Sequence, residues 1–362
     1  MASIEKIQIN NFKSHKKFIT DLSNDSQQIV VYGENGVGKT NLIEALSFFS
    51  NSKGLRGDNI EKVITNHDQA INTNIKINIL SNHQKYNLSL SIKEKESKLQ
   101  KILYLDDKKT SLIKIKEIIS FIWLTPYMDK IMYEGQSIKR KFLDKMIAQN
   151  NKIFNNQIID YQKNVSERIQ VLKSSKDEKW LNIIETKISE NMLEIFKTRR
   201  SYSVILNDII KKNLEDFRLI EIIYKNVNFN FTEDKNTLLQ LFKEKLKTNR
   251  DIDEISKRTS FSINTDEVII FDSKKKLNSE FCSTGEQKAC LLTIILANCW
   301  KLKNENKDFI LLLDEATSHI DEGNFSKLIN EIEKFKTQIW YTGTSKKLFQ
   351  VIENKAFFIH LQ

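Results

Sequence analysis

The octapeptide GENGVGKT, residues 33–40, indicates the fold class of this sequence. It matches the phosphate-binding pattern G-x-x-x-x-G-K-[ST] without departure. The apolar run QQIVVYG (27–33) comes before it and the helix-like NLIEALSFFS (41–50) comes after it, which is the strand-turn-helix context that the pattern needs. Only nine glycines occur in 362 residues. Three of them in one octet therefore indicate a backbone that a ligand approaches closely, rather than a coincidental glycine-rich turn.

The residue types in this loop predict how a nucleotide is held. Glycines let backbone N–H groups reach phosphates, Lys39 brings a positive charge to the outer phosphates, and the Thr40 hydroxyl ligates Mg²⁺ at a helix N-terminus. The predicted nucleotide-binding residues are Gly33, Glu34, Asn35, Gly36, Val37, Gly38, Lys39 and Thr40.

A second stretch, FILLLDE (309–315), supplies carboxylates at the end of a buried strand. Side chains at the carboxyl ends of parallel strands lie beside the ligand in open α/β sheets. We therefore expect Asp314 to hold Mg²⁺, through water, and Glu315 to act as the general base toward the attacking water. A pair of helix-capping carboxylates is the alternative interpretation.

The two ends of the chain predict one α/β core with an antiparallel β subdomain. Alternating or apolar runs indicate strands at 3–9, 27–33, 71–80, 85–92 and 98–105, the last three forming an antiparallel meander, and again at 309–315, 338–344 and 355–361. The C-terminal runs alternate with helical stretches, as in a parallel sheet. We expect residues 1–126 and 261–362 to form this head.

Residues 127–260 are predicted to be a mainly helical lobe inserted into the head. Apolar residues recur every three or four positions from 138 to 172, which predicts one long helix, and again from 181 to 214 after the polar break KSSKDEK (173–179). The result is an antiparallel helical pair over about 137–216, too short for a long coiled-coil arm. Further strands are expected at 219–231 and 267–271.

Composition limits the classes of function. The formal charge of +10 and the sequence pI near 9.2 favour an anionic partner. The three cysteines have no metal-ligand spacing, so we expect them to be reduced and packed. The most apolar run, ACLLTIILANCW (289–300), is shorter than a membrane span, and the N-terminus has no signal-peptide core. These features predict a soluble, cytoplasmic protein.

The stretch STGEQ (283–287) reads as a helix start with a capping box, which does not need its glycine. A γ-phosphate that approaches the serine hydroxyl does benefit from a glycine at this place. Ser283, Gly285, Glu286 and Gln287 resemble the signature motif of ABC-type ATPases, in the S-T-G-E-Q rather than the L-S-G-G-Q form. A simple helix cap is the alternative.

Taken in order along the chain, the motifs resemble the RecF family of bacterial DNA replication and repair proteins, whose heads are ABC-type and SMC-like. The resembling pieces are IQINNFKSH (7–15), GENGVGKTNLIEALSFFS (33–50), GLRG (54–57), WLTPYMDK (123–130), RKFLDKM (140–146), STGEQKA (283–289), LLLDEATSHID (311–321) and WYTGTS (340–345). They cover nearly the whole chain.

The resemblance implies a homodimer with two ATP molecules and Mg²⁺ at its interface. In ABC-type ATPases the signature contacts the ATP of the other subunit, which assigns this role to Ser283, Gly285 and Glu286, and Asp321 matches the loop that crosses the interface. ATP would close the dimer as a clamp and slow, DNA-stimulated hydrolysis would reopen it. The resemblance also implies binding to single-stranded DNA or single-strand/duplex junctions, cooperation with RecR and RecO in loading RecA, and support of SOS induction.

The chain departs from the related patterns at three places. Thr344 stands where transporter-type ABC proteins have a switch histidine, which leaves the γ-phosphate sensor open, and Tyr127 lies where a glutamine near Mg²⁺ is usual. SINT (262–265) replaces a G-P-H-R-like segment of many RecF proteins. Arg56 in GLRG follows the phosphate-loop helix and is a candidate to report DNA to the ATP site.

Short basic clusters are candidates for contacts with DNA phosphates that do not read sequence. They are Lys139, Arg140, Lys141, Arg199 and Arg200, with Lys274–Lys276, Lys346 and Lys347 as further clusters. A solvated surface is the alternative for each of them.

Three other classes of function agree less well with the sequence. A transport ATPase subunit would have a shorter spacing from phosphate loop to signature, and a GTPase would have an N-K-x-D motif, which does not occur here. A DNA-binding module that holds nucleotide without productive hydrolysis is the closest alternative, and Glu315 argues against it.

Overall fold

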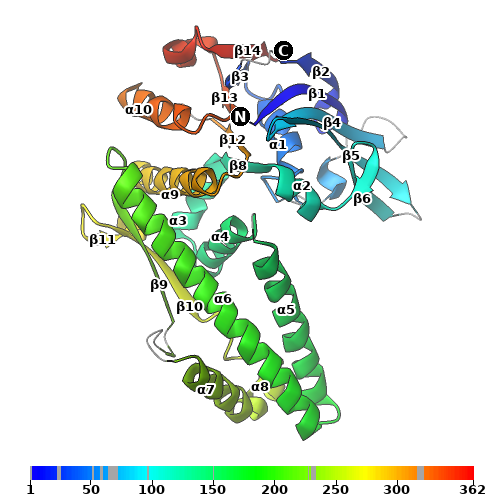
Figure 1. Cartoon of the computed structure of the whole chain (residues 1–362), viewed down its shortest axis with the longest axis vertical. Helices are drawn as coiled ribbons and strands as arrows, with labels where there is room; N and C mark the ends of the chain where they lie inside the picture. The colour runs from blue at the N-terminus through cyan, green and yellow to red at the C-terminus, as the bar shows by residue number, and fades with distance from the viewer. Residues whose placement is uncertain are drawn as a thin grey trace. The chain divides into compact units, whose positions relative to one another are not determined.

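The structure, a computed structural model, describes residues 2–22, 26–50, 53–57, 60–63, 72–95, 98–149, 151–226, 228–229, 234–315 and 322–362. The chain divides into two compact units, which are described separately (Figure 1). A head unit contains residues 1–130, 213–217 and 284–362, and a helical unit contains residues 131–212 and 218–283. The predicted boundary at 126 lies close to the observed one. Residues 261–283 belong to the helical unit rather than to the head, because the strand at 266–272 pairs with the strand at 220–226 of that unit.

The head is built on a five-stranded, fully parallel sheet with the order β14-β3-β13-β12-β8. Its strands are β3 (Gln28–Tyr32), β8 (Ser120–Leu124), β12 (Phe309–Leu313), β13 (Ile339–Gly343) and β14 (Ala356–His360). Every residue of β12 and β13 is buried, as expected for a parallel sheet covered on both faces. Four of these strands were predicted and β8 was not. All five carboxyl ends lie along one edge, which is where a ligand binds in such sheets.

A second sheet of six antiparallel strands has the order β2-β1-β4-β5-β6-β7. Its strands are β1 (Ser3–Phe12), β2 (His15–Asp21), β4 (Asn72–Ser81), β5 (Gln84–Lys95), β6 (Lys98–Leu105) and β7 (Lys108–Thr110). Along β4 buried isoleucines alternate with exposed or partly exposed polar residues. One face therefore packs on the core, and the predicted meander is confirmed.

The helix that follows the phosphate loop, α1 (Lys39–Ser47), contacts β8 and β13 of the parallel sheet and β1 of the antiparallel sheet (Figure 1). One hydrophobic core joins its Leu42 and Leu46 to residues of both sheets. The other described elements of the head are η1 (Ile60–Val63), α2 (Leu112–Ile118), η2 (Pro126–Asp129), α9 (Thr284–Asn304), α10 (Glu322–Glu333) and η4 (Lys346–Ile352). The helix α1 is thus held by contacts with both the parallel and the antiparallel sheet.

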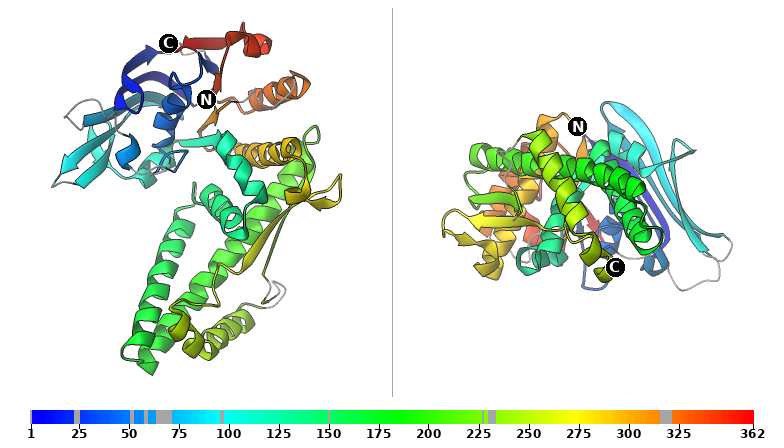
Figure 2. Two further views of the ribbon diagram at one scale, coloured as in Figure 1. Left: turned by 180° about the vertical axis from the view of Figure 1, so that it is seen from behind. Right: turned by 90° about the horizontal axis from the view of Figure 1, so that it is seen from below.

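The helical unit contains α4 (Gln136–Ala148), α5 (Lys152–Lys173) and α6 (Glu178–Asn213). The antiparallel pair of α5 and α6 agrees with the prediction (Figures 1 and 2). The single helix predicted over 138–172 is wrong, because it is divided into α4 and α5. Asn151 caps the new start: its side chain accepts a hydrogen bond from the Phe154 N–H at 2.9 Å.

The rest of the helical unit is a small antiparallel sheet, β11-β10-β9, and three short helices. The elements are α3 (Lys130–Tyr133), β9 (Ile220–Asn226), α7 (Lys235–Thr248), α8 (Arg250–Ser256), β10 (Asp266–Asp272), β11 (Leu277–Asn278) and η3 (Ser279–Phe281). Both predicted strands are present, although the part of the first beyond Asn226 falls largely outside the described residues. Pairing of β10 with β9 is what assigns residues after 260 to this unit.

Among the helices of the described part, none combines the length and the apolarity that a membrane span requires. All three cysteines, Cys282, Cys290 and Cys299, are buried, which agrees with the prediction that they are packed.

Candidate active site

The phosphate loop is held against the turn that joins β1 to β2. A Cβ at Gly38, whose φ is +100°, would lie 2.3 Å from Ser14 Oγ and 2.9 Å from His15 Nε2. The His15 Nε2–H donates to the Gly38 carbonyl at 3.0 Å, and burial lowers the pKa of His15, which favours the neutral ring. Only glycine fits at position 38, because both the backbone angle and the close approach exclude a side chain.

Lys39 lies inside the loop with 8% of its surface exposed. Its Nζ donates to the carbonyls of Gly33 and Glu34 at 2.8 and 2.7 Å. These bonds hold the ammonium group in the concavity of the loop, where the outer phosphates of a nucleotide are received in this motif.

Asp314 is the polar centre of the site. Its Oδ1 accepts hydrogen bonds from the Thr40 hydroxyl at 3.0 Å and from the Thr342 hydroxyl at 2.7 Å. Three segments of the head thus meet at one carboxylate: the start of α1, the end of β12 and the end of β13. Burial raises the pKa of Asp314, while the two hydroxyl groups oppose this shift. Thr40 and Asp314, each of which the sequence analysis expects to hold Mg²⁺, thus lie within hydrogen-bonding distance of each other.

Glu315 follows at the edge of the sheet and its side chain is exposed. The residue has a left-handed backbone, with φ near +50°, which is uncommon for a side chain other than glycine. Its N–H donates to Thr342 Oγ1 at 2.8 Å. One threonine hydroxyl therefore fixes both the Asp314 carboxylate and the backbone that directs Glu315.

The donor set suits Mg²⁺. A hydroxyl and a carboxylate lie 3.0 Å apart at Thr40 and Asp314, and Mg²⁺ prefers such oxygen ligands together with phosphates and water. In the described residues no group of three or more His, Cys, Asp and Glu side chains is arranged to hold a metal by itself.

Thr342 and His15 are site residues that the sequence interpretation missed. The side chain of Thr342 is fully buried near the end of the otherwise apolar strand β13. A lone hydroxyl group in a buried strand needs a hydrogen-bond partner, and this is the feature of the sequence that could have indicated its role. Thr344, the predicted possible sensor, is exposed two residues further on. Its role stays a prediction.

Arg56 lies near the first turns of α1 and beside Tyr127. Its Nη1 donates to Asn41 Oδ1 at 3.3 Å and lies 3.8 Å from Glu44 Oε2, and its guanidinium is 5.7 Å from the centre of the Tyr127 ring. The two residues that the sequence analysis considered separately are thus neighbours. The positive charge of Arg56 also opposes the rise in the pKa of Asp314.

The signature residues lie at the N-terminal end of α9. Ser283 and Gly285 are exposed and Glu286 is partly exposed. Apart from its chain neighbours and the backbone of α9, a Cβ at Gly285 would meet no atom of the described residues within 4 Å. Packing within the chain therefore does not require this glycine, in contrast to Gly38. Asp321 lies outside the described residues.

Three of the five DNA candidates are occupied inside the helical unit, so their assignment as phosphate contacts is corrected. Arg199 is 1% exposed and binds both oxygens of Asp144 at 2.8 Å and Asp266 at 2.7 Å. Arg140 donates to the Asp266 carbonyl, and Lys139, 4% exposed, lies 3.2 Å from Glu280. Burial of charge demands such pairing.

The remaining two DNA candidates, Lys141 and Arg200, are exposed. Each of them directly follows a buried arginine in the sequence. A run of basic residues on these helices therefore contains both exposed and buried side chains. The sequence of such a run does not indicate which of its residues are buried and which are exposed.

Fold and site together define an ATPase head of the ABC type, with a phosphate loop, an acidic strand end and a signature helix on a mixed α/β core. The RecF/RecN/SMC N terminal domain family matches residues 3–360, and the chain belongs to this family. Along its full length it resembles curated RecF proteins.

The DNA replication and repair protein RecF of Rickettsia felis is 28% identical over 99% of this chain and 98% of the relative. Two solved structures of the recombination mediator protein RecF of the RecFOR pathway have the same fold. The one described as RecF-ATP has a TM-score of 0.84 with 23% identity, over 95% of this chain and 92% of that chain. The one described as RecF-ATPrS has a TM-score of 0.82 with 24% identity, over 96% and 94%.

Proposed function

We propose that this protein is an ATP-dependent DNA-binding protein of replication and recombinational repair that acts in the cytoplasm. The observation that carries the proposal is the convergence of Thr40 and Thr342 on the buried carboxylate of Asp314, with Glu315 directly after it. Membership in the RecF/RecN/SMC family supports it. The reaction is hydrolysis of ATP to ADP and phosphate.

Each residue has a distinct part in this proposal. Lys39 binds the outer phosphates, and Glu315 accepts the proton of the water that attacks the γ-phosphate. Thr40, and Asp314 through water, would hold Mg²⁺, which neutralises phosphate charge when it is bound. Thr342 keeps the two acidic residues in position through its hydroxyl group.

We propose that two copies of the chain enclose two ATP molecules. Ser283, Gly285 and Glu286 would bind the ATP of the partner subunit, and Asp321 would lie at the same interface. The open space at Gly285 supports this role, because a glycine that its own chain does not need leaves room for a phosphate. Closure on ATP and opening after hydrolysis would make the dimer a clamp.

The DNA partner is proposed to be single-stranded or a single-strand/duplex junction, bound without sequence preference. The formal charge of +10 and the exposed Lys141 and Arg200 support phosphate contacts. Arg56 would report bound DNA to the ATP site and stimulate a slow hydrolysis. RecR, with RecO and RecA downstream, are the proposed protein partners, in a pathway that loads RecA and supports SOS induction.

The clamp is tested by the mass of Glu315→Gln protein in solution, measured by light scattering with and without ATP and Mg²⁺. We expect a monomer without nucleotide and a dimer with it, because the variant binds ATP and retains it. The double variant Glu315→Gln, Ser283→Arg should stay monomeric, since an arginine at this place blocks the approach of the partner's phosphate.

The two arms of this experiment separate the possible failures. A mass that ATP does not change, with DNA absent or present, would contradict the clamp. A dimer that forms equally well with Ser283→Arg would show that the signature serves only as a helix cap.

Thr342→Val tests whether the threonine hydroxyl organises the acidic residues. We expect the rate of ATP hydrolysis to fall about 10- to 100-fold, because two hydrogen bonds to a buried carboxylate and a backbone N–H are lost, at about 1–3 kcal/mol in total. Phosphate release at saturating ATP is the measurement. Thr344→Val is the competing variant: a larger loss there would make Thr344 the sensor and contradict the role of Thr342.

A further inference from the structure

A groove of about 910 Å³ runs along the helical unit between α5, α8 and the segment 257–265. Three of the four residues of SINT (262–265), namely Ser262, Asn264 and Thr265, line it. The groove lies wholly within one unit, so its shape does not depend on the ATP site. A groove of this size accommodates a ligand of several residues.

The charge of the groove is entirely positive. Lys173 at the end of α5, and Lys257 and Arg258 after α8, are exposed and line it. No Asp or Glu is among the residues that line it. The chain as a whole carries 57 basic and 47 acidic residues, so this separation of charge is local. An anionic ligand fits the groove electrostatically.

The groove also offers apolar contacts. Val165, Ile169 and Ile252 line it, and Ile252 is 60% exposed. Ile255, one turn further along α8, does not line the groove but precedes the lining residue Ser256, and it is 82% exposed. Two large aliphatic side chains at the surface of a seven-residue helix are an unusual exposure of apolar area, and such exposure marks contact sites.

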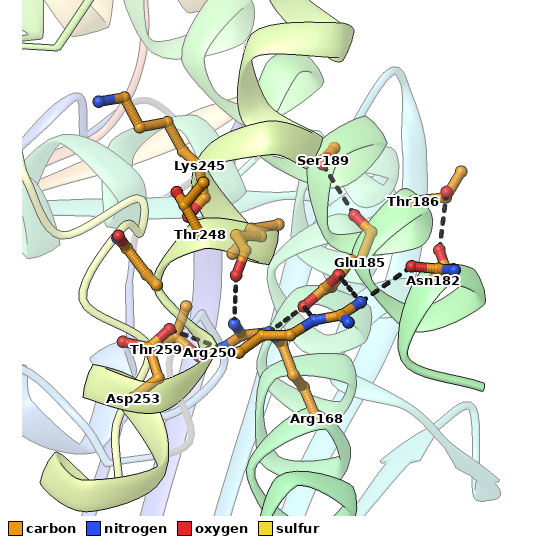
Figure 3. A network of polar contacts seen from close by, with 12 residues as sticks. Arg168, Asn182, Glu185, Thr186, Ser189, Lys245, Thr248, Arg250, Asp253 and Thr259 are labelled. Carbon is orange, nitrogen blue, oxygen red and sulfur yellow. Dashed lines mark hydrogen bonds and ion pairs between the residues drawn. The ribbon is translucent and has the colours of Figure 1, made fainter. Parts of the chain in front are cut away.

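A buried ionic network holds the wall of the groove in place (Figure 3). Arg168 of α5 donates to Asp253 of α8 at 2.7 Å and to Thr259 at 3.2 Å. The other oxygen of Asp253 accepts a hydrogen bond from the Ser260 N–H at 2.7 Å. The segment that carries Lys257 and Arg258 is thus pinned at both ends.

The same network pairs both of its arginines with carboxylates. Glu185 of α6 accepts from Arg168 at 2.9 Å and from Arg250 at 3.0 and 2.7 Å, and Figure 3 shows both guanidinium groups directed at this carboxylate. The buried arginines are therefore satisfied by Glu185 and Asp253, and Arg250 also by Glu178 at 2.8 Å, so the arginines do not add to the basic rim. A preformed groove lowers the entropic cost of binding.

We propose that this groove binds an extended acidic peptide segment of a partner protein, one in which carboxylates alternate with aliphatic residues. The carboxylates would pair with Lys173, Lys257 and Arg258, and the aliphatic residues would cover Ile252 and Ile255. The hydroxyl and amide side chains between them supply hydrogen bonds for the peptide backbone. The proposal does not depend on ATP hydrolysis or on the clamp.

Nucleic acid fits the groove less well. Single strands bind by stacking bases on exposed aromatic side chains. Tyr161 is the sole aromatic residue among those that line the groove, and it is 3% exposed with its hydroxyl accepting from the Ile263 N–H at 3.3 Å. The groove therefore offers bases no exposed aromatic ring on which to stack.

The test is fluorescence anisotropy of the full chain with a labelled peptide of four Asp-Leu repeats. Peptides of Lys-Leu and Asp-Ser repeats and a labelled thymidine oligonucleotide are the comparison probes. We expect the Asp-Leu peptide to bind more tightly than both comparison peptides. The variant Lys257→Glu, Arg258→Glu should weaken this binding by about tenfold, the combined effect of several exposed charge pairs. Ile252→Ser, Ile255→Ser should also weaken it.

Lys163→Glu is the matched control, because Lys163 is exposed on α5 and does not line the groove. It should leave the affinity unchanged, and circular dichroism should show the same fold for every variant.

Absence of Asp-Leu binding, or binding that the groove variants do not weaken, overturns the proposal. So does an oligonucleotide affinity that falls with the groove variants while peptide binding does not. A wild-type dimer that Ile252→Ser, Ile255→Ser dissociates without nucleotide would assign the surface to self-association and overturn it too. Measuring ATP-induced dimerisation of the same variants separates this result from the clamp.

Discussion

Glu315→Gln protein is expected to hydrolyse ATP about 100- to 10,000-fold more slowly than wild type while it still binds ATP. Removal of a positioned general base has an effect of this size. The substitution keeps the shape of the side chain and the N–H that donates to Thr342, so the Asp314 carboxylate and the phosphate loop remain in place. Single-turnover phosphate release and equilibrium binding of a fluorescent ATP analogue are the measurements.

Glu305→Gln is the matched control, because Glu305 pairs with Lys301 and Lys307 at the end of α9 and takes no part in the site. Its turnover should equal that of wild type. If wild-type protein shows no hydrolysis above the Glu315→Gln level, with or without DNA, the protein is a nucleotide-gated DNA-binding module without productive hydrolysis. A fall of less than about threefold would remove Glu315 from the role of general base.

Arg168→Leu is expected to destabilise the helical unit by about 3–5 kcal/mol. Arg168 is fully buried and binds Glu185, Asp253, Thr259 and the Leu246 carbonyl. The variant leaves Asp253 as a buried carboxylate that has lost its cation, which costs far more than the pair itself contributes. Hydrogen exchange with mass spectrometry should show more than a hundredfold loss of amide protection in α8 and the adjoining part of α5.

Two controls test the physical cause. Arg168→Leu, Asp253→Asn should recover part of the lost protection, because the second change removes the uncompensated charge. Lys163→Leu, on the exposed side of α5, should alter stability by less than about 0.5 kcal/mol. An Arg168→Leu protein within about 1 kcal/mol of wild type would contradict the structural role of the network.

The sequence predicted the parts of this molecule that depend on local pattern. The phosphate-loop motif, apolar strand runs and alternating runs located α1 and most of both head sheets, and they selected Thr40 and Asp314, which lie 3.0 Å apart. The division of the long helical run could not be predicted from apolar spacing, because the periodicity continues across 149–151 while the Asn151 cap starts a new helix. The strand β8 carries the same apolar character as its neighbours but no separate motif.

The remaining misses come from contacts between distant segments. Thr342 contacts Asp314 and the Glu315 N–H only after the parallel strands align, and a single threonine in a strand does not reveal this. Burial of Arg140 and Arg199 depends on Asp144 and Asp266, which come from α4 and β10. Runs of basic residues in the sequence therefore predicted more positive charge at the surface than the structure has.

The order of the parallel sheet has a consequence for synthesis on the ribosome. β3, which leads into the phosphate loop, lies between β13 and β14, so both of its neighbours are made only after residue 338. Leu361 closes the loop, for its N–H donates to the Tyr32 carbonyl at 2.9 Å and its own carbonyl lies against Gly33. During synthesis, the phosphate loop therefore lacks the two strands that neighbour β3 until the whole helical unit has been synthesised and can fold. Nucleotide would bind to this chain only near the end of translation, and ribosome stalling before residue 338 would leave a chain that does not retain ATP.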